Sequence, residues 1–371
     1  MTIIIWSIVG VIVLVCAVMF IGGMRFRHEL NNTGADYFIQ FIEENKDSPR
    51  FSMVLQYNQA KLIELRPEEP LPLASTVKII IAIEYARQAA EGRIDPEMEV
   101  ELKALNQYYV PKTDGGAHEA WIAHLGLKEE SDTVPVSEIA YGMIAFSSNA
   151  NTEYLMDLLG LDSIQKLITE LDLQYHEPLY PLVSSLFVAS DLMKEQQLTK
   201  GETLSALKQM DLAEYRLAAI QIHNRISSSP LTAEDKQKLS KWLSLDVQKV
   251  WSDRLPRSTT RDYVSIMEKL NSKSYFSNEA HQYLDPVMEG LMRDSRNQEW
   301  LQHAGQKGGS TMFVLTNAMY ATDKEGNTLE LAIFMTDLTW KEQAKLSHSL
   351  NSFQLKLLTD ETVREHLKGI K

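Results

Sequence analysis

Hydrophobic positions divide the chain into a long apolar run near its start and a larger remainder with helix and strand patterns. Residues 3–23 are apolar apart from Ser7 and carry no charge, which matches the length and hydropathy of a membrane-crossing helix. No basic residue precedes the run and no small-x-small cleavage site follows it, so we predict an uncleaved anchor rather than a signal peptide. Residues 1–24 are assigned to this transmembrane anchor and residues 25–34 to a linker.

The remainder, residues 35–371, is long enough for one large domain or two small ones. Alternating runs near both of its ends predict strands, and turn residues at 58–59 and 323–327 predict the hairpins that join them. Helical periodicity dominates between these two regions. The predicted strands are 51–57, 61–65, 313–322 and 328–336, and the predicted terminal helices are 36–42 and 340–357.

One helix is too apolar for the surface. The run from Val77 to Ile83 contains a single polar residue, Lys78, so it predicts a buried central helix. A lysine on the first turn of a buried helix is costly unless it has a partner or a chemical role. Ser75 lies three residues before Lys78, and residues at that spacing share one helix face, so the amine can serve the hydroxyl as a base.

The Ser-x-x-Lys pattern is weak on its own. It recurs at Ser163 with Lys166 and at Ser205 with Lys208, and both pairs lie on ordinary amphipathic helix patterns. Two further strings matter in combination with Ser75. Ser147-Ser148-Asn149 supplies a hydroxyl and a carboxamide at a helix end, where helix capping is the ordinary role. Lys307-Gly308-Gly309-Ser310 supplies an ammonium on a predicted strand.

In this order and at these separations the three strings resemble the penicillin-recognising serine hydrolases, meaning the class A β-lactamases and related D,D-peptidases. The resemblance covers nearly everything after the anchor. It implies an α/β (α+β) fold of the β-lactamase/transpeptidase type: an antiparallel sheet assembled from both chain ends and flanked by helices, with an inserted all-helical subdomain. Helical patterns at about 186–257 exceed what a compact class A enzyme needs and are interpreted as an elaboration of that subdomain.

The resemblance also assigns roles to individual residues. Ser75 is the predicted nucleophile, Lys78 its base when neutral, and Ser147 the proton relay to the leaving nitrogen. Backbone N–H groups of Ser75 and Ser310 are the predicted oxyanion hole. The predicted substrate-binding residues are Asn149, Lys307, Gly309 and Ser310.

Two features depart from the family pattern. Gly308 stands where the family has threonine or serine, which removes one contact to a substrate carboxylate, and Ser310 or Thr311 is a possible substitute. Glu177-Pro178 resembles the Glu-Pro of the class A Ω-loop, so Glu177 is a candidate base for deacylation. Glu177 lies closer to Asn149 than the family spacing, and a solvated proline-rich loop with an incidental glutamate is an equally good interpretation.

Composition excludes several other classes. A net charge of −13 without a basic stripe argues against nucleic acid as a partner. Cys16 is the only cysteine, so no internal disulfide is expected, and nine scattered histidines without ligand spacing predict no metal and no cofactor. Arg25 and Arg27 follow the anchor, and the positive-inside rule then favours a cytoplasmic domain. The resemblance implies the opposite face, and we predict a single-pass protein of the cell membrane with an extracytoplasmic domain.

The leading hypothesis is a membrane-anchored serine hydrolase that forms an acyl-enzyme at Ser75 and hydrolyses β-lactam amides. A D,D-carboxypeptidase or an esterase with the same machinery is the close alternative. A penicillin-binding sensor, which is acylated without turnover, is the hypothesis from another class. The expected partners are a β-lactam or a D-Ala-D-Ala-like peptide, together with the membrane through residues 3–23.

Overall fold

The computed structural model describes residues 27–370, which separate into two compact units. The smaller unit holds residues 27–45 and 339–370, and the larger unit holds residues 46–338. The predicted anchor at residues 3–23 lies outside the described residues. Within 27–370, no helix combines the length and the hydropathy that a membrane crossing requires.

The smaller unit joins the two ends of the described chain. Its helices are α2 (Ala35–Asn45), α17 (Trp340–Thr359) and α18 (Glu361–Lys368), and a helical turn at 27–31 precedes them. The rings of Phe38 and Phe353 stack with their centroids 4.5 Å apart, which fixes α2 against α17. The two predicted terminal helices are therefore confirmed, whereas α18 was not predicted.

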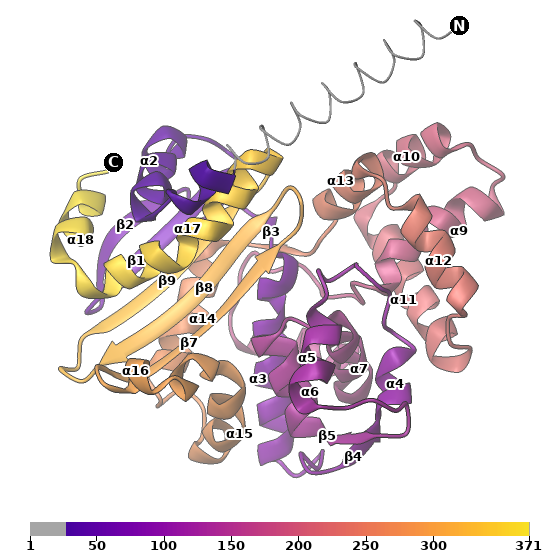
Figure 1. Ribbon diagram of the computed structural model, residues 1–371, viewed down its shortest axis with the longest axis horizontal. Helices are drawn as coiled ribbons and strands as arrows, with labels where there is room; N and C mark the ends of the chain where they lie inside the picture. The colour runs from indigo at the N-terminus through magenta and orange to yellow at the C-terminus, as the bar shows by residue number, and fades with distance from the viewer. Residues whose placement is uncertain (1–26, 371) are drawn as a thin grey trace, which may run out of the picture. The chain divides into compact units, whose positions relative to one another are not determined.

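The larger unit contains a five-stranded antiparallel sheet with the order β2-β1-β9-β8-β7, so both chain ends contribute to it as predicted (Figure 1). Asn58 and Gln59 both have positive φ, 50° and 64°, which is the conformation of a tight two-residue hairpin. β7 is an edge strand. The strands are β1 (Phe51–Tyr57), β2 (Ala60–Leu65), β7 (Leu301–Ser310), β8 (Leu315–Asp323) and β9 (Thr328–Met335).

One helix of the larger unit covers a face of this sheet. α14 (Thr260–Asn271) packs against β1, β8 and β9. Tyr263, Ile266, Met267 and Leu270 are buried, and their spacing is the i, i+3, i+4, i+7 stripe of a helix that faces a core.

The predicted central helix is α3 (Lys78–Ala90), whose residues are buried almost without exception. It follows the 3₁₀ turn η1 (Ala74–Val77) and ends just before Gly92, whose φ of 68° is typical of a helix stop. The helices packed around α3 are α6 (Val136–Ala145), α7 (Asn149–Leu159), α8 (Leu161–Glu170) and α15 (Asn278–Met288).

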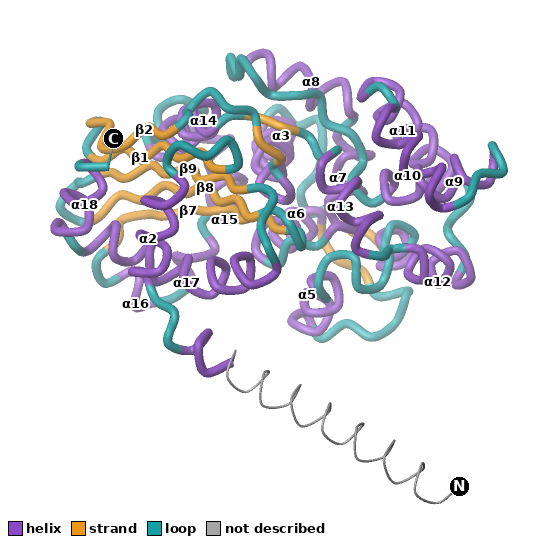
Figure 2. The backbone as a smooth tube through the Cα atoms, turned by 90° about the horizontal axis from the view of Figure 1, so that it is seen from above, coloured by secondary structure: helices purple, strands orange, loops and turns teal. Residues whose placement is uncertain are grey.

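The predicted elaboration is also helical. Its elements gather at one end of the larger unit (Figure 2), and Thr232 forms a full capping box with Asp235 at the start of one of these helices. These elements are α9 (Val188–Glu195), α10 (Lys200–Gln209), α11 (Leu212–Ser228), α12 (Ala233–Trp242) and α13 (Leu245–Asp253).

Short elements complete the larger unit. β3 pairs with β6, and this two-stranded ladder holds the approach to Ser75 beside residue 257. The short elements are β3 (Leu71–Pro72), β4 (Glu99–Glu101), β5 (Thr133–Pro135), β6 (Arg257–Ser258), α4 (Leu102–Asn106), α5 (Ala117–Leu125), α16 (Ser295–Gln298), η2 (Ser184–Phe187) and η3 (Gly290–Arg293).

Candidate active site

The Ser75 segment is held directly against the sheet. Ser75 lies in η1 and is half-buried, whereas Lys78, the first residue of α3, is fully buried. The Thr76 hydroxyl is 2.7 Å from the Thr316 hydroxyl of β8. Thr316 donates in turn to the carbonyl of Leu73 at 2.8 Å. Two buried threonines therefore fix the turn that carries the predicted nucleophile.

Gly309 allows β7 to approach the backbone of this turn. A Cβ at Gly309 would lie 2.6 Å from the Ser75 nitrogen and 2.7 Å from the Leu73 oxygen, both of which are backbone atoms. Any side chain at this position would therefore displace the turn or the strand. This contact places the edge strand beside the N–H group of Ser75, which is one of the two predicted oxyanion donors.

The amine of Lys78 binds the loop between α6 and α7. Its Nζ donates to the Ser147 carbonyl at 2.7 Å and to Asn149 Oδ1 at 2.8 Å, and it lies 3.3 Å from Ser147 Oγ. Ser147 has a φ of 71°, a left-handed conformation that is rare outside glycine and asparagine. Such strain is typical of functional loops, and here it turns both the carbonyl and the hydroxyl of Ser147 towards Lys78.

Lys307 reaches the same hydroxyl from β7. Its Nζ donates to Ser147 Oγ at 3.0 Å and to the Gly308 carbonyl at 2.7 Å. The Ser147 hydroxyl therefore lies between two lysine amines, one from a helix and one from a strand. The structure brings together all three sequence strings that carry the predicted chemistry.

Burial lowers the pKa of both amines. Burial, together with the charge of Lys307, holds the pKa of Lys78 well below its usual value, although Asp114 and Glu153 act in the opposite direction. Burial lowers the pKa of Lys307 to about 7. The lowered pKa of Lys78 favours its neutral form, which can accept a proton, and Lys307 can still carry the positive charge that a carboxylate needs.

Glu177 has other partners. Its Oε2 accepts from the Arg257 backbone N–H at 3.0 Å and forms an ion pair with Arg216 of α11 at 3.1 Å. The Glu177 N–H donates to the Arg257 carbonyl at 2.9 Å, so the residue is also held by its backbone. These partners are distinct from those of Lys78, which are Ser147, Ser148 and Asn149.

A different carboxylate, Glu153, lies on the helix that follows the loop between α6 and α7. Glu153 is buried on α7, one turn after Asn149, and accepts from the Val183 N–H at 2.6 Å and from Ser184 Oγ at 2.8 Å. His223 of α11 is the third partner of Glu153, with its Nδ1 atom 2.9 Å from Glu153 Oε2. Burial opposes a charge on His223, but its bonds to Asp157 and Glu153 outweigh that effect and raise its pKa to about 9. Sequence reasoning missed this role of Glu153.

Ser310 and Thr311 are the predicted substitutes for the hydroxyl that Gly308 lacks, and they differ in how far they are available. Thr311 Oγ1 accepts from Ser252 of α13 at 2.9 Å, so this hydroxyl is already engaged by the elaboration. Ser310, the last residue of β7, is exposed. The two other Ser-x-x-Lys pairs lie on the outer helices α8 and α10, where Lys166 and Lys208 are exposed.

Two further residues support the loop and were also missed. Asp114 accepts from the N–H groups of Gly116 and Asn149, at 3.2 and 3.4 Å. His118, which is fully buried, lies 2.9 Å from Ser148 Oγ. The Asp-Gly-Gly turn that begins at Asp114 was a visible loop signal, but nothing in the sequence indicated which loop it would contact.

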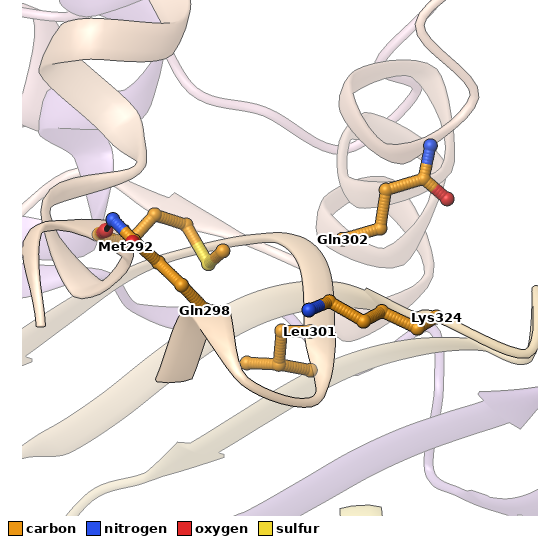
Figure 3. Close-up of a pocket in the computed structure, with 5 residues that line it drawn as sticks. All are labelled: Met292, Gln298, Leu301, Gln302 and Lys324. Carbon is orange, nitrogen blue, oxygen red and sulfur yellow. Dashed lines mark hydrogen bonds between the residues drawn. The ribbon is translucent and has the colours of Figure 1, made fainter. Parts of the chain in front are cut away.

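A hollow of about 530 Å³ lies elsewhere in the larger unit, and Figure 3 shows the side chains that line it. They come from η3, α16, the start of β7 and the turn after β8, and none is a predicted site residue. The polar ends of Gln302 and Lys324 do not converge (Figure 3). Within residues 27–370, no group of three or more histidine, cysteine or acidic side chains is arranged to hold a metal ion.

Comparison with known proteins identifies the family and the fold of the chain. The model of a family described as the beta-lactamase enzyme family matches residues 37–350. The chain belongs to this family. Family membership indicates a serine hydrolase, and the fold is the β-lactamase/transpeptidase-like fold. No curated protein matches the chain by sequence.

Solved structures show the same fold at low sequence identity. A class A β-lactamase from Bacteroides cellulosilyticus is 14% identical with a TM-score of 0.51, and the match covers 86% of this chain and 98% of that one. A β-lactamase from Chitinophaga pinensis is 12% identical, with a TM-score of 0.51 and coverage of 89% and 97%. The TLA-3 extended-spectrum β-lactamase is 13% identical, with a TM-score of 0.52 and coverage of 88% and 100%.

Proposed function

We propose that this family member is a serine hydrolase that forms an acyl-enzyme at Ser75 with β-lactam amides or with D-Ala-D-Ala-like peptides. The observation that carries the proposal is the shared contact of Lys78 and Lys307 with the Ser147 hydroxyl. Lys78 lies one helical turn after Ser75, where its neutral form can supply the base, and Lys307 on the other side of the Ser147 hydroxyl can supply the anchor for a carboxylate.

The proposed reaction follows from these positions. Neutral Lys78 takes the proton of the Ser75 hydroxyl as Oγ attacks the carbonyl carbon of the substrate. The N–H groups of Ser75 and Ser310 stabilise the oxyanion, and the amide C–N bond breaks as the leaving nitrogen receives a proton through the Ser147 hydroxyl. Protonated Lys307 holds the substrate carboxylate, and water later cleaves the acyl ester to regenerate Ser75.

Labelling with a fluorescent penicillin tests the proposal. Wild-type protein should form a covalent adduct at Ser75, and Ser75→Ala should remove it completely. Ser163→Ala and Ser205→Ala serve as matched controls, because each also alters a Ser-x-x-Lys pair but on an outer helix. Labelling that survives Ser75→Ala, or that is absent in the wild type, would contradict the assignment.

The partners of Glu177 favour a second candidate in which acylation is followed by slow turnover. A deacylation base needs a carboxylate that is free to bind water, and this one is paired with Arg216 and with the Arg257 N–H. Glu153 instead accepts from the Val183 N–H and the Ser184 hydroxyl, so in the free protein both Glu177 and Glu153 are already bound to protein groups. A D,D-peptidase or a penicillin-binding sensor fits this arrangement better than a rapid β-lactamase does.

The location of the domain is a separate proposal. We infer from the apolar run at residues 3–23 that the protein is a single-pass membrane protein whose hydrolase domain faces the extracytoplasmic side. Proteolysis of intact and of permeabilised cells tests this arrangement. Cleavage of the domain in intact cells supports it, and protection until permeabilisation contradicts it.

A further inference from the structure

A buried histidine that belongs to none of the three sequence strings contacts the loop at residues 147–149, between α6 and α7. His118 is the second residue of α5 and is fully buried. Its ring packs between Tyr109 and Trp121, with centroid distances of 4.7 and 5.6 Å. Nδ1 lies 2.9 Å from Ser148 Oγ, and Nε2 lies 3.1 Å from the Asn106 carboxamide. Aromatic packing and two polar contacts therefore fix the orientation of this imidazole.

The direction of the Ser148 bond can be assigned from its neighbours. The Asn151 carboxamide donates from Nδ2 to the Ile139 carbonyl at 3.1 Å, so its Oδ1 faces Ser148. The single hydroxyl proton of Ser148 is donated to this Oδ1 at 2.9 Å. His118 must then donate from Nδ1 to Ser148 Oγ. The Nε2 atom is then an acceptor. The Asn106 carboxamide can donate to it once its oxygen and nitrogen are exchanged by a 180° flip of the amide group.

Neutrality of the ring agrees with this assignment. Burial lowers the pKa of His118 to about 4, so the imidazole carries one proton at neutral pH. A neutral ring has one donor and one acceptor. The proton on Nδ1 is committed to Ser148, and the ring has no spare proton for catalysis.

Ser148 connects this ring to the catalytic amine. Its carbonyl lies 3.5 Å from Lys78 Nζ, and its neighbours Ser147 and Asn149 supply the two shorter contacts to the same amine. Ser148 also caps α7 by accepting from the Asn151 N–H at 3.2 Å. A shift of Ser148 would therefore move every oxygen that binds the proposed base.

We propose that His118 is a positioning residue for acylation, and that its Nδ1–H bond to Ser148 holds the Ser147–Asn149 loop in the geometry that binds Lys78. The expected effect of His118 on the rate of acylation rests on the proposed function of the site. The bond itself is a property of the free protein, so it can be tested separately.

Two substitutions separate the two ring nitrogens. An asparagine at residue 118 places its amide nitrogen near the position of Nδ1, so His118→Asn keeps a donor for Ser148 and loses the Asn106 contact. A glutamine reaches the position of Nε2, so His118→Gln keeps the Asn106 contact and loses the donor to Ser148. The exposed His348 of α17 provides His348→Gln as a control for the chemical change alone.

The first measurement is hydrogen exchange of the amides at residues 147–152 in the free protein, with thermal melting as a check on folding. We expect His118→Gln to speed exchange roughly tenfold, as for the loss of one buried hydrogen bond, and His118→Asn to stay near the wild type. Equal exchange in the two variants, or faster exchange only in His118→Asn, would overturn the proposal.

The second measurement is the rate of acylation by a fluorescent penicillin. His118→Gln should slow acylation roughly tenfold, and His118→Asn should restore most of the rate. In a Ser148→Ala background His118→Gln should cost nothing further, because its partner is already absent. Additive losses would overturn the inference while leaving Ser75 in place. Failure of wild-type labelling would refute the proposed function, and the exchange result would still decide the role of His118.

Discussion

The Lys78 cluster and the Glu177 loop both carry predicted catalytic side chains, but they are built differently. Lys78 and Lys307 lie on α3 and β7, and both reach one hydroxyl, Ser147 Oγ, at 3.3 and 3.0 Å. Glu177 lies in a loop, and its carboxylate is held by Arg216 of α11 at 3.1 Å. The two lysines of the proposed acylation step are therefore positioned by regular elements of the fold, whereas the partner of Glu177 comes from the elaboration.

This difference suggests what the elaboration does. α11 contributes Arg216 to Glu177 and His223 to Glu153, so one added helix binds both acidic residues. α13 contributes Ser252 to Thr311, next to the end of β7. Within the proposed mechanism, we infer that the added helices influence deacylation and carboxylate recognition.

The largest expected effect is that of Lys78→Ala on acylation. Removal of a general base costs about two to four orders of magnitude, and we expect a loss in that range for penicillin labelling measured by stopped flow. Lys166→Ala and Lys208→Ala are matched controls on outer helices and should leave the rate unchanged. If Lys78→Ala slows acylation by less than about threefold, Lys78 is not the base. The Lys78 cluster would then differ from the Glu177 loop in structure but not in catalytic role.

The next largest expected effect on acylation is that of Gly309→Ala, with the neighbouring Gly308 as its control. Gly309→Ala should slow acylation by about a hundredfold, comparable to the loss of one oxyanion donor, because its Cβ would meet the Ser75 nitrogen at 2.6 Å. Gly308→Ala is the control on the same strand: its Cβ would lie 3.6 Å from Asn317 and from the Thr316 carbonyl, an ordinary contact. Equal rates for the two variants would show that β7 does not have to approach Ser75 closely.

Most of the fold could be predicted from the sequence where local signals are strong. The β1–β2 hairpin, the buried α3 and the β8–β9 hairpin follow from periodicity and turn residues, and the structure confirms them. The Lys78 cluster was predictable as a set because its residues sit in three recognisable strings. His118, Arg216 and Glu153 were not, because each acts through a partner distant in sequence, and no local pattern of a lone histidine, arginine or glutamate identifies that partner.

The pH dependence of substrate binding sharpens the role of Lys307. Its pKa of about 7 means that the ammonium loses its proton as the pH rises through neutrality. The affinity for a carboxylate-bearing substrate should therefore fall, by up to about tenfold between about pH 6 and about pH 8, following the charged fraction. A methyl ester of the same substrate should show little change, and Lys307→Ala should abolish the dependence. A pH dependence that is identical for acid and ester would argue against an electrostatic role.

The smallest expected effect is that of Glu177→Gln, and it decides between the two candidate functions. Glutamine keeps the size of the side chain and can still accept from the Arg257 N–H, so the loop should fold. The ion pair with Arg216 is partly exposed, with 17% and 26% of the two side chains accessible, so its loss should cost little stability. We expect acylation and deacylation, followed by time-resolved intact mass, to stay within about twofold of the wild type.

Arg216→Gln is the matched control for the Glu177 substitution, because it breaks the same ion pair from the other side and leaves the carboxylate in place. Two similar variants with a long-lived Ser75 adduct would mean that the pair only shapes the loop, which supports the peptidase or sensor. The contrary result would be rapid turnover in the wild type and in Arg216→Gln, with an adduct that accumulates only in Glu177→Gln. In that case the carboxylate leaves Arg216 to activate water in the acyl-enzyme, and hydrolysis of β-lactams becomes the function.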